Sequence, residues 1–203
     1  FQGTIVPEKS QITLRKGLIQ MQKVALGKAL YDFTKERQYA GTADLMVDMS
    51  GTFTNNADIP TKLNGIWNVN IVDGLYPAFL SNEDSNLRNT FSLASANGVI
   101  ERGVIVSNNF ILSGPMVDMS GKGWLNMGNN EMDMTVSVTF AKVPTVPVRF
   151  YGRASAPQMS VQGVNMVVET VQAAGMGIFS LVRNIFELPA HAVRGIDSIV
   201  NKK

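Results

Sequence analysis

The sequence predicts an all-β protein: a strongly curved antiparallel sheet, wound as a meander with an apolar groove, followed by C-terminal amphipathic helices. Three observations predict this class. Short runs of β-branched, Met and aromatic residues alternate with turn signals as far as about Val161. Within these runs apolar and polar residues alternate, most strictly from Glu131 to Phe140. After Pro157 the apolar residues recur instead at three and four, the period of a helix.

The turn signals divide the first part of the chain into ten expected strands. Pairs such as Asn64-Gly65, Asp73-Gly74, Asn97-Gly98 and Arg102-Gly103, and the triplet Gly128-Asn129-Asn130, are typical of hairpin turns. Two stretches rich in Asn, Asp and Ser, 54–61 and 80–88, are expected to be exposed loops. The strands are expected near 12–18, 20–26, 29–34, 43–53, 63–72, 91–99, 104–112, 116–127, 131–140 and 146–154.

Each expected strand has one apolar face and one polar face. Trp67, Val69 and Ile71 fall on one side of their strand, and Asn68 and Asn70 fall on the other. The same alternation gives apolar faces to 116–127 and 146–152, whereas Trp124 falls on the polar face with Asp118 and Lys122. The segment "MVDMSG" occurs twice, at 46–51 and 116–121, which is compatible with two related hairpin units or with chance.

The tail, 162–203, is predicted to form amphipathic helices. Its apolar residues recur at three and four up to the breaker Leu188-Pro189, and a shorter helix is expected over 190–200. Gly175 and Gly177 each weaken the first helix by about 1 kcal/mol relative to Ala, so packing on an apolar surface is needed to hold it.

Composition bounds the organisation of the chain. Its 203 residues are enough for one large β domain, 4–161, and the helical tail. Phe1, Gln2 and Gly3 resemble the end of a protease site used in expression tags, so residues 1–3 are interpreted as a tag remnant and any N-terminal anchor as removed. A net charge of +2 with scattered cations argues against nucleic-acid binding, and the lack of cysteine excludes disulfide and thiol chemistry.

The residues that catalysis needs are missing, so no enzyme, cofactor or metal is predicted. The one histidine, His191, lies in the tail without a nearby Ser, Cys or carboxylate. Asp48 and Asp118 occupy matching places in the two "MVDMSG" copies, but on polar strand faces, where solvated carboxylates are expected. The run "SGKG" at 120–123 lacks the spacing of a phosphate loop.

Three segments in order resemble the C-terminal region of AsmA-like proteins. They are "ADLMVDMSGTFTNNADIPTKLNGIWNVNIVDGLY", "FSLASANGVIERGVIVSNNFILSGPMVDMSGKGWLNMGNNEMDMTVSVTF" and "VPVRFYGRASAPQMSV", which together cover about 43–161. The resemblance implies a Gram-negative envelope protein with a periplasmic β-rich body and an N-terminal inner-membrane helix. It further implies a greasy groove that conducts phospholipid toward the outer membrane, and it carries no catalytic motif.

Two functions are compatible with the residues. An apolar strand face can hold acyl chains, since apolar contact is non-directional and Met adapts to chains of varied shape. The helix residues Val171, Ile178, Val182 and Ile185 would cap such a groove. Alternatively the same faces form a sealed core, and the tail docks another envelope protein. The expected groove lining is Val47, Met49, Trp67, Val69, Ile71, Val117, Met119, Leu125, Met127, Met132, Met134, Val136, Val138 and Phe140.

Overall fold

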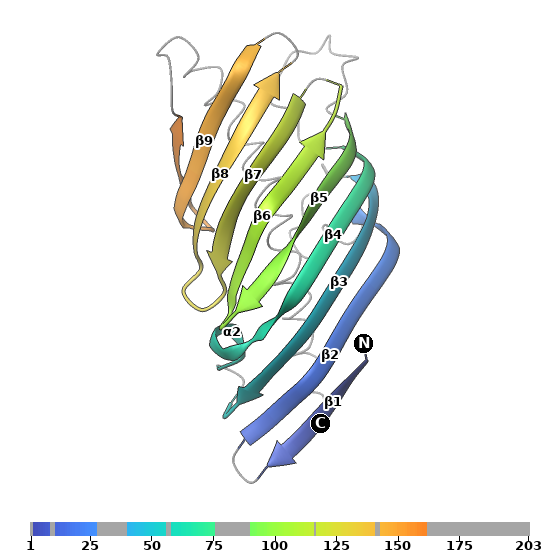
Figure 1. Ribbon diagram of the computed structural model, residues 1–203, viewed down its shortest axis with the longest axis vertical. Helices are drawn as coiled ribbons and strands as arrows, with labels where there is room; N and C mark the ends of the chain where they lie inside the picture. Colours follow the sequence, from blue (N-terminus) through green and yellow to red (C-terminus); the bar gives the residue numbers. More distant parts are fainter. Residues whose placement is uncertain are drawn as a thin grey trace.

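A single antiparallel sheet organises the computed structural model, which describes residues 2–8, 11–27, 40–55, 58–75, 90–115, 117–140 and 143–161. Ten strands lie side by side in chain order, and β1 does not pair with β10, so the sheet is open (Figure 1). The predicted all-β meander is confirmed. The strands are β1 (Gln2–Glu8), β2 (Gln11–Ala25), β3 (Ala40–Phe53), β4 (Asn64–Leu75), β5 (Thr90–Glu101), β6 (Val104–Ser113), β7 (Val117–Asn126), β8 (Glu131–Phe140), β9 (Val143–Arg153) and β10 (Gln158–Val161).

The first strands differ from the prediction. The two strands expected at 12–18 and 20–26 are one strand, β2. The neighbouring strand β3 pairs with β2 on both sides of two register shifts, one between Leu14 and Gly17 and one between Met21 and Val24, so β2 is not divided. β1 was not predicted, and its Gln2 and Gly3 pair with Leu18 and Gly17. That residues 1–3 are a tag remnant stays a prediction.

A short edge strand and a short helix also differ from the prediction. The edge strand β10 was not expected, because four residues are too few to show a period. Part of the loop expected at 54–61 is the short helix α2 (Ile59–Lys62), which has Pro60 in its first turn. The strand expected at 29–34, the loop at 80–88, the helical tail and His191 all lie outside the described residues.

Two of the five turn signals form turns. Arg102 and Gly103 join β5 to β6 with φ of 47° and 78°, and Asn130, with φ of 60°, closes the turn between β7 and β8. The other three signals were wrong as turns, because Asn64-Gly65, Asp73-Gly74 and Asn97-Gly98 lie within β4 and β5. At Gly98 the glycine is needed for close approach, since a Cβ there would lie 1.7 Å from the carbonyl oxygen of Val106.

A β-bulge interrupts β6 in the middle of the sheet. The register with both β5 and β7 shifts there, and two consecutive residues, Asn108 and Asn109, are exposed. The bulge changes which residues face inward, from Ile105 and Ser107 before it to Phe110 after it. A bulge bends its strand and increases the local twist, which favours curvature of the sheet.

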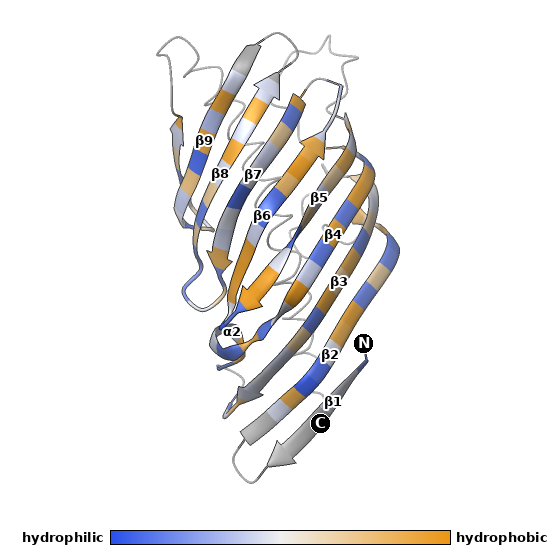
Figure 2. Cartoon of the chain, in the orientation of Figure 1, coloured by the Kyte–Doolittle hydropathy of each residue, from blue (hydrophilic) through white to orange (hydrophobic). Residues whose placement is uncertain are grey.

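The sheet has an apolar inner face and a polar outer face. We call inner the face that carries Trp67, Met134 and Val148, and outer the face that carries Asp118 and Arg149. Orange and blue residues alternate along the strands in Figure 2, as expected when successive side chains point to opposite faces. The predicted solvated positions of Asp118, Ser120 and Lys122 on the outer face are confirmed.

Candidate functional site

The inner face is the candidate site, and it contains the predicted lining almost completely. Met127 lies just beyond β7 and packs, partly buried, against the cluster. The side chain of Phe140 and the cap residues Val171, Ile178, Val182 and Ile185 lie outside the described part of the chain. The following predicted residues are buried on this face: Val47, Met49, Trp67, Val69, Ile71, Val117, Met119, Leu125, Met132, Met134, Val136 and Val138.

The prediction missed many residues of the same face. Leu45 belongs to the alternation that gave Val47 and Met49, so the sequence held its signal. Phe110 and Leu112 were harder to predict, because the bulge before them breaks the alternation of β6. Val146, Val148 and Phe150 were predicted as the apolar face of their strand, and they are buried here too. Further buried members are Leu14, Ile19, Phe53, Leu63, Phe91, Ala94, Ala96, Ile100, Ile105 and Ala154.

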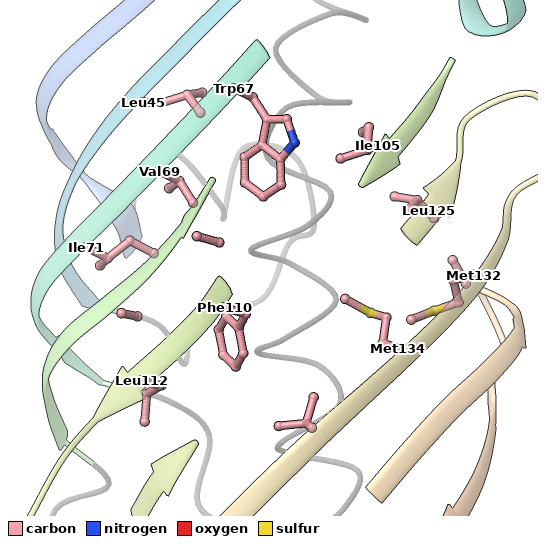
Figure 3. Close-up of a cluster of buried hydrophobic side chains, with 14 of the residues drawn as sticks. Leu45, Trp67, Val69, Ile71, Ile105, Phe110, Leu112, Leu125, Met132 and Met134 are labelled. Atoms are coloured by element: carbon pink, nitrogen blue, oxygen red, sulfur yellow. The ribbon is translucent and has the colours of Figure 1, made fainter. Parts of the chain in front are cut away.

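The lining residues converge from distant parts of the chain. In Figure 3 the labelled side chains of β3 and β4 and those of β6 to β8 point toward one shared space. Val69 of β4 and Met134 of β8 therefore face the same region although three strands lie between their own strands. The curvature of the sheet makes its inner face concave.

Trp67 is the largest fully buried side chain of this face. Its indole Nε1 donates a hydrogen bond to the carbonyl oxygen of Val106, at 3.3 Å, and so reaches across β5 to β6. The indole ring passes over Gly98 of β5, which pairs with Trp67 and has no side chain to obstruct the ring. The indole N–H is satisfied without a polar partner on the inner face itself.

The inner face offers apolar contact and almost no polar chemistry. Among the described residues Ser107 is the one polar side chain that is buried, and its hydroxyl donates to the carbonyl oxygen of Asn97 at 2.7 Å. Four methionines, Met49, Met119, Met132 and Met134, lie among the aliphatic residues. Thioether side chains adapt to irregular neighbours, so this lining suits flexible hydrocarbon better than a rigid, polar ligand.

The inner side chains are covered. Val47, Val69 and Val148 have an exposed fraction of 0%, and no member of the buried cluster exceeds 8%. Apart from α2, the described residues supply no second layer over this face. A guest on the inner face must therefore displace whatever covers it.

The carboxylates of the outer face are solvated or paired. Asp48 and Asp118, the matching residues of the two "MVDMSG" copies, lie on β3 and β7 with three strands between these two, so they form no carboxylate pair. Both copies place the Val and the second Met inward, as predicted: Val47 and Met49 in the first copy, and Val117 and Met119 in the second. Asp133 accepts two hydrogen bonds from the guanidinium of Arg149, which lower the pKa of its carboxyl.

Neither a metal-binding group of side chains nor a membrane-spanning helix occurs within the described ranges. No group of three His, Cys, Asp or Glu side chains there could hold a metal ion. No described helix is long and apolar enough to cross a membrane.

The chain matches no known family model, no curated protein and no solved structure. The functional argument therefore rests on the residues and geometry of the inner face.

Proposed function

We propose that this chain is a non-enzymatic lipid-binding domain whose inner face holds phospholipid acyl chains and conducts them between the inner and outer membranes. One observation carries the proposal: the inner face is apolar from β2 to β9, with Ser107 as its one buried polar side chain among the described residues. A continuous apolar strip lets an acyl chain slide, because dispersion and hydrophobic contact have no fixed register.

The open sheet supports the same proposal. A closed barrel would limit a guest to its two ends. A sheet whose edge strands β1 and β10 do not pair with each other leaves the long side of the concave face accessible once its cover moves. Phospholipids carry a headgroup that must stay in water while the chains are buried, and a trough with an open side satisfies both needs.

We further propose that the segment 162–203 is the cover. Its apolar residues recur at helical spacing, and Val171, Ile178, Val182 and Ile185 would face the sheet. An amphipathic helix and an acyl chain compete for the same apolar surface, so lipid would enter as the helix leaves. A periplasmic location with an N-terminal inner-membrane anchor follows only from the AsmA-like resemblance and stays a prediction.

The low exposure of the inner face favours a second function. If lipid never enters, the inner face is the sealed core of a structural domain whose tail docks another envelope protein. The two functions differ in whether lipid ever touches the inner side chains.

Photo-methionine, a diazirine analogue of Met, tests this difference in the full chain. Met119, Met132 and Met134 report on the inner face. Met46, which pairs with Gln20 and Asn68 on the outer face, is the control in the same molecule. The labelled protein is mixed with phospholipid vesicles, irradiated and digested, and the adducts are identified by mass spectrometry. Phospholipid adducts concentrated on the inner methionines are expected. Adducts only with other peptides of the chain would overturn lipid binding and favour the sealed core.

A further inference from the structure

A second site lies at one end of the sheet, away from the middle of the inner face. A pocket of about 540 Å³ is bounded there by β2, β3, α2 and the turn between β5 and β6. Arg15 of β2, Lys62 of α2 and Arg102 of the turn all line it, and none of its lining residues is acidic. We call it the cationic pocket. Three cations from three separate elements meet in a chain whose net charge is only +2.

One carboxylate close to the cationic pocket offsets part of this charge. Asp58 accepts a hydrogen bond from Lys62 Nζ at 2.8 Å and two more from the backbone N–H and the hydroxyl of Thr54. The Lys62 hydrogen bond first, and those of Thr54 next, hold the pKa of Asp58 well below its usual range. Arg15 and Arg102 form no ion pair with any described residue. Their mutual repulsion with Lys62 is relieved when an anion binds between them.

The backbone of Arg102 supplies an independent observation. Its φ of 47° lies in the left-handed region, at a turn position where Asn, Asp or Gly is usual. The turn is fixed beside α2, since Asn64 Oδ1 accepts the Arg102 N–H at 3.0 Å and Gly103 N–H donates to the Leu63 carbonyl at 2.8 Å. These two hydrogen bonds therefore fix the backbone of Arg102 at the edge of the cationic pocket.

Hydroxyl groups complete the donors of the cationic pocket. Thr13 and Thr52 face each other across β2 and β3, with their hydroxyl oxygens 3.5 Å apart, and both line the pocket. Hydroxyls and guanidinium groups donate readily to the oxygens of a phosphate, and a guanidinium does so in pairs. We propose that the cationic pocket binds a phosphate group, either free or as the headgroup of a lipid.

The position of the cationic pocket relates it to the inner face. Leu14 lines the pocket and is also a member of the buried inner cluster. Thr13 and Thr52 of the same pocket alternate with the inward Leu14 and Phe53, so a phosphate held by their hydroxyls lies on the outer side of the sheet, behind Leu14. The proposal does not depend on lipid binding by that face, because inorganic phosphate has no acyl chain.

Titration of the full chain by NMR tests the proposal, with inorganic phosphate and dihexanoyl-phosphatidylglycerol as separate probes. Saturable shifts are expected for the amides of Thr13, Thr52 and Arg102. Similar affinity for both probes would identify a site for free phosphate, and much tighter binding of the lipid would identify a headgroup site. No saturable shift with either probe would overturn the proposal.

Two variants assign the effect to the cationic pocket. The double variant Arg15→Gln/Arg102→Asn is expected to lower phosphate affinity by about tenfold or more, since charged hydrogen bonds are lost. Arg153→Gln removes the same type of charge at the end of β9 and is expected to leave affinity unchanged. Arg102→Asn alone is expected to raise the melting temperature while it weakens binding, because Asn suits the turn. Unchanged affinity in the double variant would refute the site.

Discussion

On β8 the inner side chains Met132, Met134, Val136 and Val138 are at most 2% exposed, whereas the outer side chains Asp133, Thr135, Ser137 and Thr139 are all partly exposed. Neighbouring residues of one strand thus experience an apolar and an aqueous environment. The inner environment extends over distant strands, while the outer contacts are local pairs such as Asp133 with Arg149. Substitutions on the inner face should therefore have large, cooperative effects, and those on the outer face small, separate ones.

The largest expected effect comes from a charge on the inner face. Val136→Asp places a carboxylate where the side chain is 1% exposed, and should destabilise the fold by about 4 kcal/mol or more. Thr135→Asp is the matched control, since its neighbours across β7 and β9 are Lys122 and Arg149, and it should change stability by less than about 0.5 kcal/mol. Urea unfolding measures both. A Val136→Asp protein of normal stability would show that water reaches the inner face.

The close approach of strands at Gly98 is expected to matter next. In Gly98→Ala the new methyl group must displace the Val106 carbonyl, and the indole of Trp67 lies 3.1 Å away, so a loss of about 2 kcal/mol is expected. The neighbouring exposed residue gives the control, because Asn97→Ala keeps the backbone contacts and should cost about 0.5 kcal/mol or less. Thermal unfolding compares the two. Equal effects would mean that the strands can separate at this point without penalty.

Methionine on the inner face should contribute adaptability more than stability. Met134→Leu conserves volume and is expected to cost less than about 1.5 kcal/mol. If acyl chains contact this residue, the stiffer side chain should narrow the range of chain lengths that bind. Lipid extracted from the wild type and the variant, analysed by mass spectrometry, tests this. An identical lipid profile would exclude contact of Met134 with the chains.

The smallest effect is expected from the outer ion pair. Asp133→Asn removes the pair with Arg149, which is partly exposed at both ends, and should cost less than about 1 kcal/mol. The pKa of Asp133 is lowered in the folded state, so its contribution is present above the usual value near 3.8 and is lost as pH falls through the lowered pKa. Acid unfolding of the variant should therefore depend less on pH below about 4. Identical acid profiles would show that the pair contributes nothing to stability.

Sequence reasoning succeeded where the environment of a residue is set by its own strand. Alternation along β8 and β4 correctly placed Met132, Val136 and Trp67 inward, because side chains on a strand alternate whatever lies beyond it. It failed where pairing partners decide the outcome. The continuity of β2 depends on β3, and the strand positions of Asn64-Gly65 and Asn97-Gly98 depend on how closely neighbouring backbones approach.

The sequence by itself determined the strand periodicity, the two chemically different faces and the absence of cysteine. Only the tertiary structure decided that the apolar faces form one buried concave surface and that Arg15, Lys62 and Arg102 line one pocket. The physical reason is the range of the interactions. Alternation is a local property of an extended backbone, whereas the depth of burial and the meeting of charges depend on register, bulges and curvature across the whole sheet.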